Sequence, residues 1–403
     1  MGFAAGSVAF SRFAVVGEHP KEIEQEILDK LAELTLESGE YGVPEEVEYG
    51  WCGGRHILDR HFTFENNVFA DALHFAMRID TNRVPSELKH AYQAIEEEAL
   101  AAQNPSGFIS KNQKREAKDS VRRKIESELK EGRFRRSKLI PMLWDFQTQT
   151  LLTSATNTAA EKLHELFERT FGLTLEALSA GTLANRHLVS KGKRRDYEDA
   201  RPTRFVQGPE GESQWPDYPW TAKGDQPKDY MGNEFLLWLW HEVDHHHGTI
   251  KVDGGKTDGG EISLFIDHTL QLDCAYGQSG KDTLRATGPT RMPEAADALR
   301  TGKLPRRCGM NVEAGGKQVS LMFNPEAFFC SGVKLPDVED ADSPRVVFEE
   351  RISMLRDLSQ SLDALFNAFL ATRAGSGWES KTTTIRRWIS QPVKPLALAA
   401  APA

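Results

Sequence analysis

The sequence predicts an α+β protein with mixed or antiparallel sheets, flanking helices and two lobes. Segments in which nearly every second residue is apolar are typical of strands, such as Ser7–Val16, where only Arg12 interrupts the alternation. Segments with apolar residues at helical spacing, such as Thr156–Phe171, are typical of amphipathic helices. With 403 residues, 39% hydrophobic and 27% charged, the chain is long and apolar enough to bury a large core.

Both patterns occur in the first part of the chain, and we interpret residues 1–180 as an N-terminal lobe. The strands expected there are Ser7–Val16, Asn67–Ile79, Leu139–Phe146 and Leu173–Leu178. The expected helices run from Pro20 to about Leu36, Pro85 to about Ala102, Lys111 to about Gly132 and Thr156 to Phe171.

Residues 181–228 lack periodicity and are rich in Gly, Pro, Asp and Arg, so we interpret them as an irregular insertion or linker. Residues 229–373 form the second predicted lobe, and residues 374–403 are expected to be a disordered tail, with Ile385–Ile389 as the one exception within it. The helices expected in the second lobe are Tyr230–His241, Pro293–Thr301 and a long final helix that opens at Ser343-Pro344. Its expected strands are Ile262–Leu272, Thr283–Thr287, Leu304–Val312, Gln318–Phe323 and Phe328–Leu335.

One segment, residues 111–138, is strongly basic in a protein whose formal net charge is -9. It holds twelve Lys and Arg against five Asp and Glu. Its apolar residues Val121, Ile125 and Leu129 share one helical face, which leaves the cations facing solvent or a partner. The segment therefore predicts a polyanion-binding surface. An ordinary solvated helix, with Arg122–Glu126 and Lys124–Glu128 pairs, explains the same charges.

The sharpest catalytic motif is His241-Glu242-Val243-Asp244-His245. On a helix, its two histidines share a face and can ligate Zn²⁺ while the glutamate activates a water. Lys251 stands where the longer metzincin pattern needs a third histidine, and the preceding WLW explains the helix as core. A zinc-dependent metallohydrolase is therefore kept only as the alternative function, and no metal or cofactor is expected.

Other catalytic patterns are missing from the sequence, including a Walker A loop, a Rossmann glycine fingerprint and GxSxG. The four cysteines form no CxxC pair, which is typical of free thiols in a reducing cytoplasm. The longest apolar run, Phe235–Trp240, is too short to span a membrane, and Met1–Val16 does not read as a signal peptide. We therefore expect a cytoplasmic protein that is not an enzyme.

Several short motifs follow one another in a recognisable order. They are SVAFSRF (7–13), Gly50-Trp51, KREAKDSVRRKIESELKEGRF (114–134), SKLIPMLWDFQTQTLLTSATNTAAEKLHELFERTFG (137–172), DTLRATG (282–288), PEAADALRTGK (293–303) and VSLMFNPEAFFCSGVKLP (319–336). In this order and spacing the chain resembles the family of recombination-associated RdgC proteins, over most of residues 4–372. Inserts at about 181–228 and 245–282 exceed the compact members of that family.

The resemblance implies a ring-shaped homodimer that binds double-stranded DNA without sequence preference in the nucleoid. It also implies restraint of RecA-driven recombination, with RecA affected indirectly through the shared DNA. Phe134 matches an aromatic of the family's dimer interface, although it lies in GRF here and not in a proline-containing turn. Thr287-Gly288 replaces a pair of lysines. The DNA-binding residues carried over are Lys118, Arg122, Arg123, Arg133, Arg285 and Lys303, to which we add Arg306 and Arg307.

A third hypothesis, from another class, is a protein-interaction scaffold. Apolar residues recur at helical spacing between Phe348 and Phe369, and such a stripe on a long helix is able to form an oligomer seam. DNA-independent binding of a recombinase would favour this hypothesis.

Overall fold

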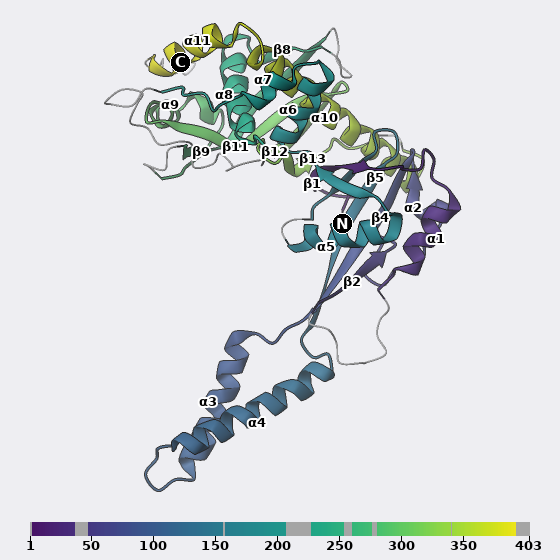
Figure 1. The fold of residues 1–403 in the computed structure, drawn as a ribbon, viewed down its shortest axis with the longest axis vertical. Helices are drawn as coiled ribbons and strands as arrows, with labels where there is room; N and C mark the ends of the chain where they lie inside the picture. Colours follow the sequence, from purple (N-terminus) through teal and green to yellow (C-terminus); the bar gives the residue numbers. More distant parts are fainter. Residues whose placement is uncertain are drawn as a thin grey trace, which may run out of the picture.

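The computed structural model describes residues 2–36, 47–155, 158–206, 227–253, 260–275, 280–339 and 341–391. It confirms the predicted α+β class, and the ladders between its strands are all antiparallel. Figure 1 shows helices packed around a long sheet, and a pair of helices that extends away from it. Within the described ranges, no helix has the length and apolar character needed to cross a membrane.

The central feature is a sheet that joins thirteen strands of the described chain. Its main path runs β10-β9-β11-β12-β13-β1-β6-β5-β4-β2, while β3, β7 and β8 pair with β4, β1 and β9. β1 (Val8–Val16) links the two halves because Val8 and Phe10 pair with β13, whereas Ser11 to Ala14 pair with β6. The first half also contains β2 (Val47–Cys52), β3 (Val68–Phe69), β4 (Ala72–Asn82), β5 (Arg135–Asp145), β6 (Thr150–Thr153) and β7 (Thr174–Ala177). The second half contains β8 (Thr249–Lys251), β9 (Glu261–Cys274), β10 (Asp282–Ala286), β11 (Lys303–Ala314), β12 (Lys317–Asn324) and β13 (Phe329–Lys334).

One hydrophobic core lies on the half formed by β1 to β7. It is closed by α1 (Gln25–Glu33) and α5 (Thr158–Phe171), whose apolar faces the sequence predicts. Trp51 and Trp144 are buried at its centre. The Nε1 of Trp51 donates a hydrogen bond of 2.7 Å to Thr170, so the buried indole is satisfied.

A second core lies on the half formed by β9 to β13, under α8 (Tyr230–His245) and α10 (Pro344–Arg373). α8 is buried over most of its length, as expected for a helix that is apolar on nearly every side. The apolar side chains between Phe348 and Phe369 are buried inside the chain. They therefore offer no seam to a second copy, and that interpretation of the final helix is wrong. The remaining short helices of the described chain include α2 (Phe64–Asn67) and α9 (Pro293–Arg300).

The interpretation of residues 181–228 as irregular is wrong for its first part. α6 (Ala180–Ser190) and α7 (Arg194–Glu198) form there. Ser179 caps α6, and Ala184 and Leu188 are buried one turn apart, so a short apolar stripe was present but was not recognised. Residues 207–226 lie outside the described ranges.

The tail interpretation is also wrong in part, because α11 (Trp378–Ser390) is a docked helix. Ile385 and Ile389 are buried at i and i+4. Trp388 packs edge-on against Trp240 of α8 at 5.4 Å between ring centroids. The exception expected at Ile385–Ile389 covers only the end of this helix, because the residues before it are mostly polar. Residues 392–403 lie outside the described ranges.

The two helices that extend from the sheet are α3 (Ser86–Ala102) and α4 (Lys111–Lys130), named here the helical hairpin. It is inserted between β4 and β5, which pair from Ala72–Asp145 to Asn82–Arg135. The turn after α3 follows the predicted break at Asn104-Pro105-Ser106-Gly107. A capping box of Ser110 and Gln113 then starts α4. α3 has no buried residue, so most of the hairpin faces solvent.

Candidate nucleic-acid interface

The exposed side of α4 carries Lys118, Arg122 and Arg123. The opposite side packs on α3 and buries Ala117 and Val121, as the apolar spacing predicts. No carboxylate of the described residues contacts Lys118 or Arg123. These two cations are therefore available to an external anion.

The two ion pairs predicted along α4 have different outcomes. Arg122 Nε donates to Glu126 at 2.9 Å, with 77% of the arginine side chain and 52% of the glutamate side chain exposed. A pair this exposed contributes at most about 0.5 kcal/mol, so an external anion can displace the carboxylate. The Lys124–Glu128 pair does not form. Lys124 Nζ lies 4.1 Å from the centroid of the Tyr92 ring instead.

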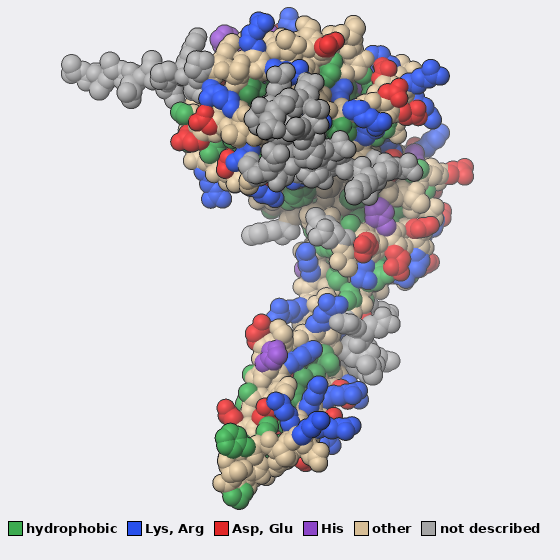
Figure 2. Space-filling model, turned by 60° about the vertical axis from the view of Figure 1, so that its left-hand side comes forward, with side chains coloured by type: hydrophobic (Ala, Val, Ile, Leu, Met, Phe, Trp, Pro, Cys, Tyr) green, Lys and Arg blue, Asp and Glu red, His purple; other side chains and the backbone are tan. Residues whose placement is uncertain are grey.

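The charge on the hairpin is unevenly distributed. α4 holds eight Lys and Arg against four Asp and Glu, whereas α3 holds four Glu against one Lys. Figure 2 shows Lys and Arg side chains gathered along the hairpin. The α4 surface is not purely basic, because its shallow outer hollow is lined by Asn112, Arg115, Glu116, Asp119, Arg122, Arg123 and Glu126. A polyanion would approach the α4 side of the hairpin and avoid the α3 side.

Arg133 lies at the base of the hairpin and has a structural partner. Its Nη1 donates to Glu128 at 2.7 Å, although 64% of the Arg133 side chain is exposed. Glu128 is buried and also accepts the Tyr92 hydroxyl at 3.0 Å. Arg133 therefore neutralises a buried carboxylate, and it is less available to an external anion than Lys118 or Arg123.

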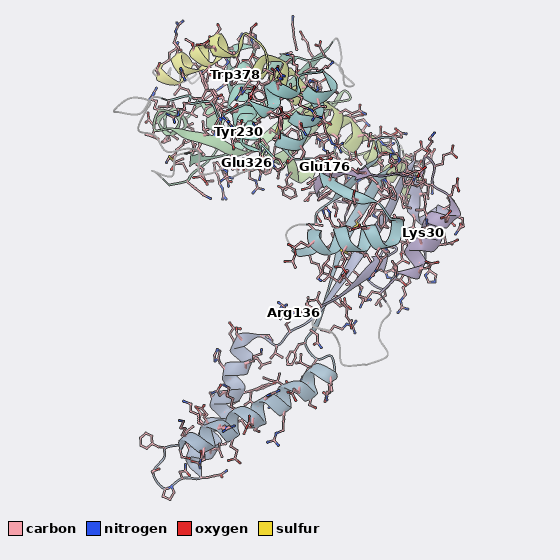
Figure 3. All side chains as sticks on the ribbon, viewed as in Figure 1. Lys30, Arg136, Glu176, Tyr230, Glu326 and Trp378 are labelled. Carbon is pink, nitrogen blue, oxygen red and sulfur yellow. The ribbon has the colours of Figure 1, made fainter. Side chains whose placement is uncertain are left out.

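Strand β5 extends the basic surface toward the sheet. Arg136 and Lys138 are exposed and two residues apart, so both project from the same face of the strand. Figure 3 places Arg136 at the junction between the hairpin and the sheet. Arg135, the first residue of β5, is instead held by Asp80 at 2.8 Å and Glu48 at 2.7 Å. The alternation of side chains along a strand places Arg136 and Lys138 on the opposite face from Arg135. The sequence prediction did not use this alternation to choose among the three cations.

The second group of predicted DNA-binding residues lies on β10 and β11. Arg285 is exposed on the edge strand β10. Lys303 is 11% exposed and pairs with Asp282 at 2.5 Å. Arg306 pairs with Asp273 at 3.4 Å and with Glu326. Arg307 Nη2 donates to Ser331 at 2.8 Å. Of these four, Arg285 is the most accessible to a phosphate.

The structure brings Lys118, Arg122 and Arg123 together on α4, but it does not bring them near the β10–β11 group. Figure 1 shows the hairpin at one end of the molecule, with β9 and β11 at the opposite end. Phe134 is half-buried where the hairpin joins β5. A more accessible aromatic is Phe108 in the loop at the hairpin tip, which is 80% exposed. The sequence prediction missed it, although its place after Pro105-Ser106-Gly107 marks an exposed turn.

The histidine motif forms the end of α8, but its groups are engaged with each other. The rings of His241 and His245 stack at 4.1 Å between centroids. His241 Nδ1 lies 2.8 Å from Glu242, and His245 Nδ1 lies 2.8 Å from the His241 carbonyl. Lys381 of α11 ion-pairs with Glu242. Among the described residues, no three His, Cys, Asp or Glu side chains are grouped so that they could hold a metal ion.

The electrostatics of this motif are those of a packed helix end. Burial lowers the pKa of His241, which favours the neutral imidazole. Burial opposes ionisation of Glu242, but contacts with His241 and Lys381 outweigh it and hold the pKa of Glu242 below its usual value. An ionised glutamate bound by a lysine is a poor water-activating base. No observation here favours the metallohydrolase.

A scan against protein-family models finds no match to the chain, and a search of curated proteins finds none. The resemblance to the RdgC family therefore stays a prediction from the sequence motifs.

Proposed function

We propose that this chain binds double-stranded DNA without sequence preference, as a ring-shaped homodimer, and thereby restrains RecA-dependent recombination in the cytoplasm. The observation that carries the proposal is the exposed basic side of α4, on a hairpin that extends from the sheet. On it, Lys118 and Arg123 have no carboxylate partner among the described residues. The motifs that resemble RdgC proteins support the same function.

The physical chemistry of the α4 surface suits a DNA backbone. Lys and Arg neutralise phosphates and release condensed counterions, which supplies affinity without reading bases. At 1.5 Å per residue, the twenty residues of α4 span about 30 Å, roughly the length of nine base pairs. The acidic α3 on the other side of the hairpin repels the duplex and limits binding to one orientation.

A dimer accounts for the separation between the two basic groups. One chain has the hairpin and β11 at opposite ends (Figure 1), so a second copy would have to supply a β10–β11 group near the first copy's hairpin. We propose Phe108 as the apolar contact between copies, in place of Phe134, because Phe108 is 80% exposed at the hairpin tip. Each copy would contribute its two predicted lobes, residues 1–180 and 229–373, to the ring.

The test is binding to labelled duplexes of two unrelated sequences across a salt series. We expect equal affinities for the two sequences at every salt concentration. We also expect about five phosphate contacts per copy, which corresponds to a slope of log K against log salt of about -4.5. A preference for one sequence, or no binding at low salt, would refute the proposed function.

A further inference from the structure

A half-enclosed cavity of about 270 Å³ lies between α10, α6 and strands β1, β5 and β6, away from the α4 surface. This volume is just below the range of pockets that hold drug-sized ligands, so the cavity would take a smaller molecule. The apolar part of its lining consists of Leu143, Leu152, Leu178, Leu183, Ile352 and Leu355.

Two ion pairs with buried members also line the cavity. Arg12 of β1 is 5% exposed and donates to both carboxylate oxygens of Asp363 on α10, at 2.8 and 2.5 Å. Arg356 donates to Asp145 at 3.1 and 2.7 Å, and Asp145 is also buried. Burying such pairs is costly, and often no more stabilising than apolar packing. Stability alone therefore does not explain why two such pairs line the same cavity, and we interpret the cavity as a binding site.

Hydrogen-bond donors of this lining remain without acceptors in the described structure. The buried Ser359 Oγ has no hydrogen-bond partner. Arg356 uses Nε and Nη2 for its contacts and leaves Nη1 without one. Arg186 lies at the exposed rim and pairs with Glu176 of β7 through Nε and Nη2, which likewise leaves Nη1. Figure 3 labels Glu176. Of these three donors only Ser359 Oγ is buried, and buried donors are rarely left unmatched in proteins, so an acceptor group is expected beside it.

We propose that this cavity binds a small monocarboxylate with an apolar body. The lining carries Arg12, Arg186 and Arg356 against Asp145 and Asp363, and Glu176 outside the lining pairs with Arg186. The Arg186–Glu176 pair is exposed and therefore weak, so the carboxylate of a ligand can replace Glu176. The aliphatic side chains contact the body of the ligand. Free guanidinium and hydroxyl donors bind its carboxylate, and such charge-assisted hydrogen bonds are stronger than neutral ones. The site stands independently of DNA binding.

The experiment titrates the full chain by calorimetry with straight-chain carboxylates from butanoate to decanoate. Hexanol and hexylamine serve as a neutral and a cationic probe of similar shape. We expect hexanoate to bind about tenfold more tightly than hexanol, and hexylamine not to bind. Affinity should rise with chain length until the cavity is full and then fall. No heat from any carboxylate at about 10 mM, or equal affinity for hexanol, would overturn the proposal.

Variants locate the site. Leu183→Trp fills the cavity and should abolish hexanoate binding. Arg186→Gln removes a rim donor and should weaken it about fivefold, whereas Arg195→Gln on the exposed α7 should leave it unchanged. Arg186 is largely exposed, so its variant retains the test if Leu183→Trp fails to fold. Hexanoate binding that persists unchanged in both cavity variants would place the site elsewhere and refute the assignment.

Discussion

Replacing Glu126 with glutamine tests the direction of the electrostatics on α4. Glu126 accepts Arg122 Nε at 2.9 Å, and it faces the same hollow as Arg122 and Arg123. Glu126→Gln removes one negative charge from that hollow and frees Arg122 for a phosphate. Folding should change by less than about 0.5 kcal/mol, because the pair is exposed. DNA binding should become tighter, which a simple loss of structure would not produce.

The size of the Glu126→Gln effect follows from counterion release. One additional phosphate contact steepens the slope of log K against log salt by about 0.9, which at about 0.1 M salt corresponds to at most an eightfold gain in affinity. Because Arg122 is already partly free, we expect about a three- to eightfold gain, which fades as salt approaches about 1 M. The assay is fluorescence anisotropy with a labelled duplex, and Glu161→Gln on α5 is the charge-matched control. Unchanged or weaker binding by Glu126→Gln would show that α4 is not the surface that meets DNA.

Asp363→Ala should lower the free energy of unfolding by about 2–4 kcal/mol, because it leaves the buried guanidinium of Arg12 without a carboxylate. Urea denaturation measures the loss, and a loss below about 1 kcal/mol would contradict the prediction. Burial lowers the pKa of His74 to about 4, below the value near 6.5 that it has when unfolded. The unfolded state alone takes up this proton as pH falls from 7 to 4, so the free energy of unfolding should fall by about 3 kcal/mol. His74→Phe should reduce this pH dependence, and an unchanged profile would refute it. If the proposed dimer forms through the hairpin tip, Phe108→Ser should be a monomer in sedimentation, whereas Phe64→Ser should remain a dimer. Two monomers or two dimers would refute the tip contact.

Local patterns predicted most of the fold. The helical spacing of Val121 and the break at Asn104-Pro105 gave α4 nearly its observed bounds, Lys111–Lys130. α10 and the strands β11 to β13 were also predicted from periodicity. Short helices with few apolar residues, such as α7 and α11, were not predicted from the sequence. Their stability comes from packing on elements far away in the sequence.

The candidate site was less predictable, because ion pairs depend on tertiary contacts. Arg306 is partly neutralised by Glu326 and Asp273, residues that only the sheet brings near it. Glu242 looked like a catalytic base until Lys381, far away along the chain, proved to be its partner. The exposure of Phe108 likewise depends on the hairpin leaving the sheet, which no local pattern encodes.

The most direct test of the central claim compares two double variants in the salt series on duplex DNA. Arg122→Ala/Arg123→Ala removes two cations from α4, and Arg194→Ala/Arg195→Ala removes two exposed cations from α7. If α4 meets the DNA backbone, the first variant should bind more weakly and flatten the slope by about 1.8, while the second should match the parent chain. Equal slopes for the parent and the α4 variant would contradict the claim.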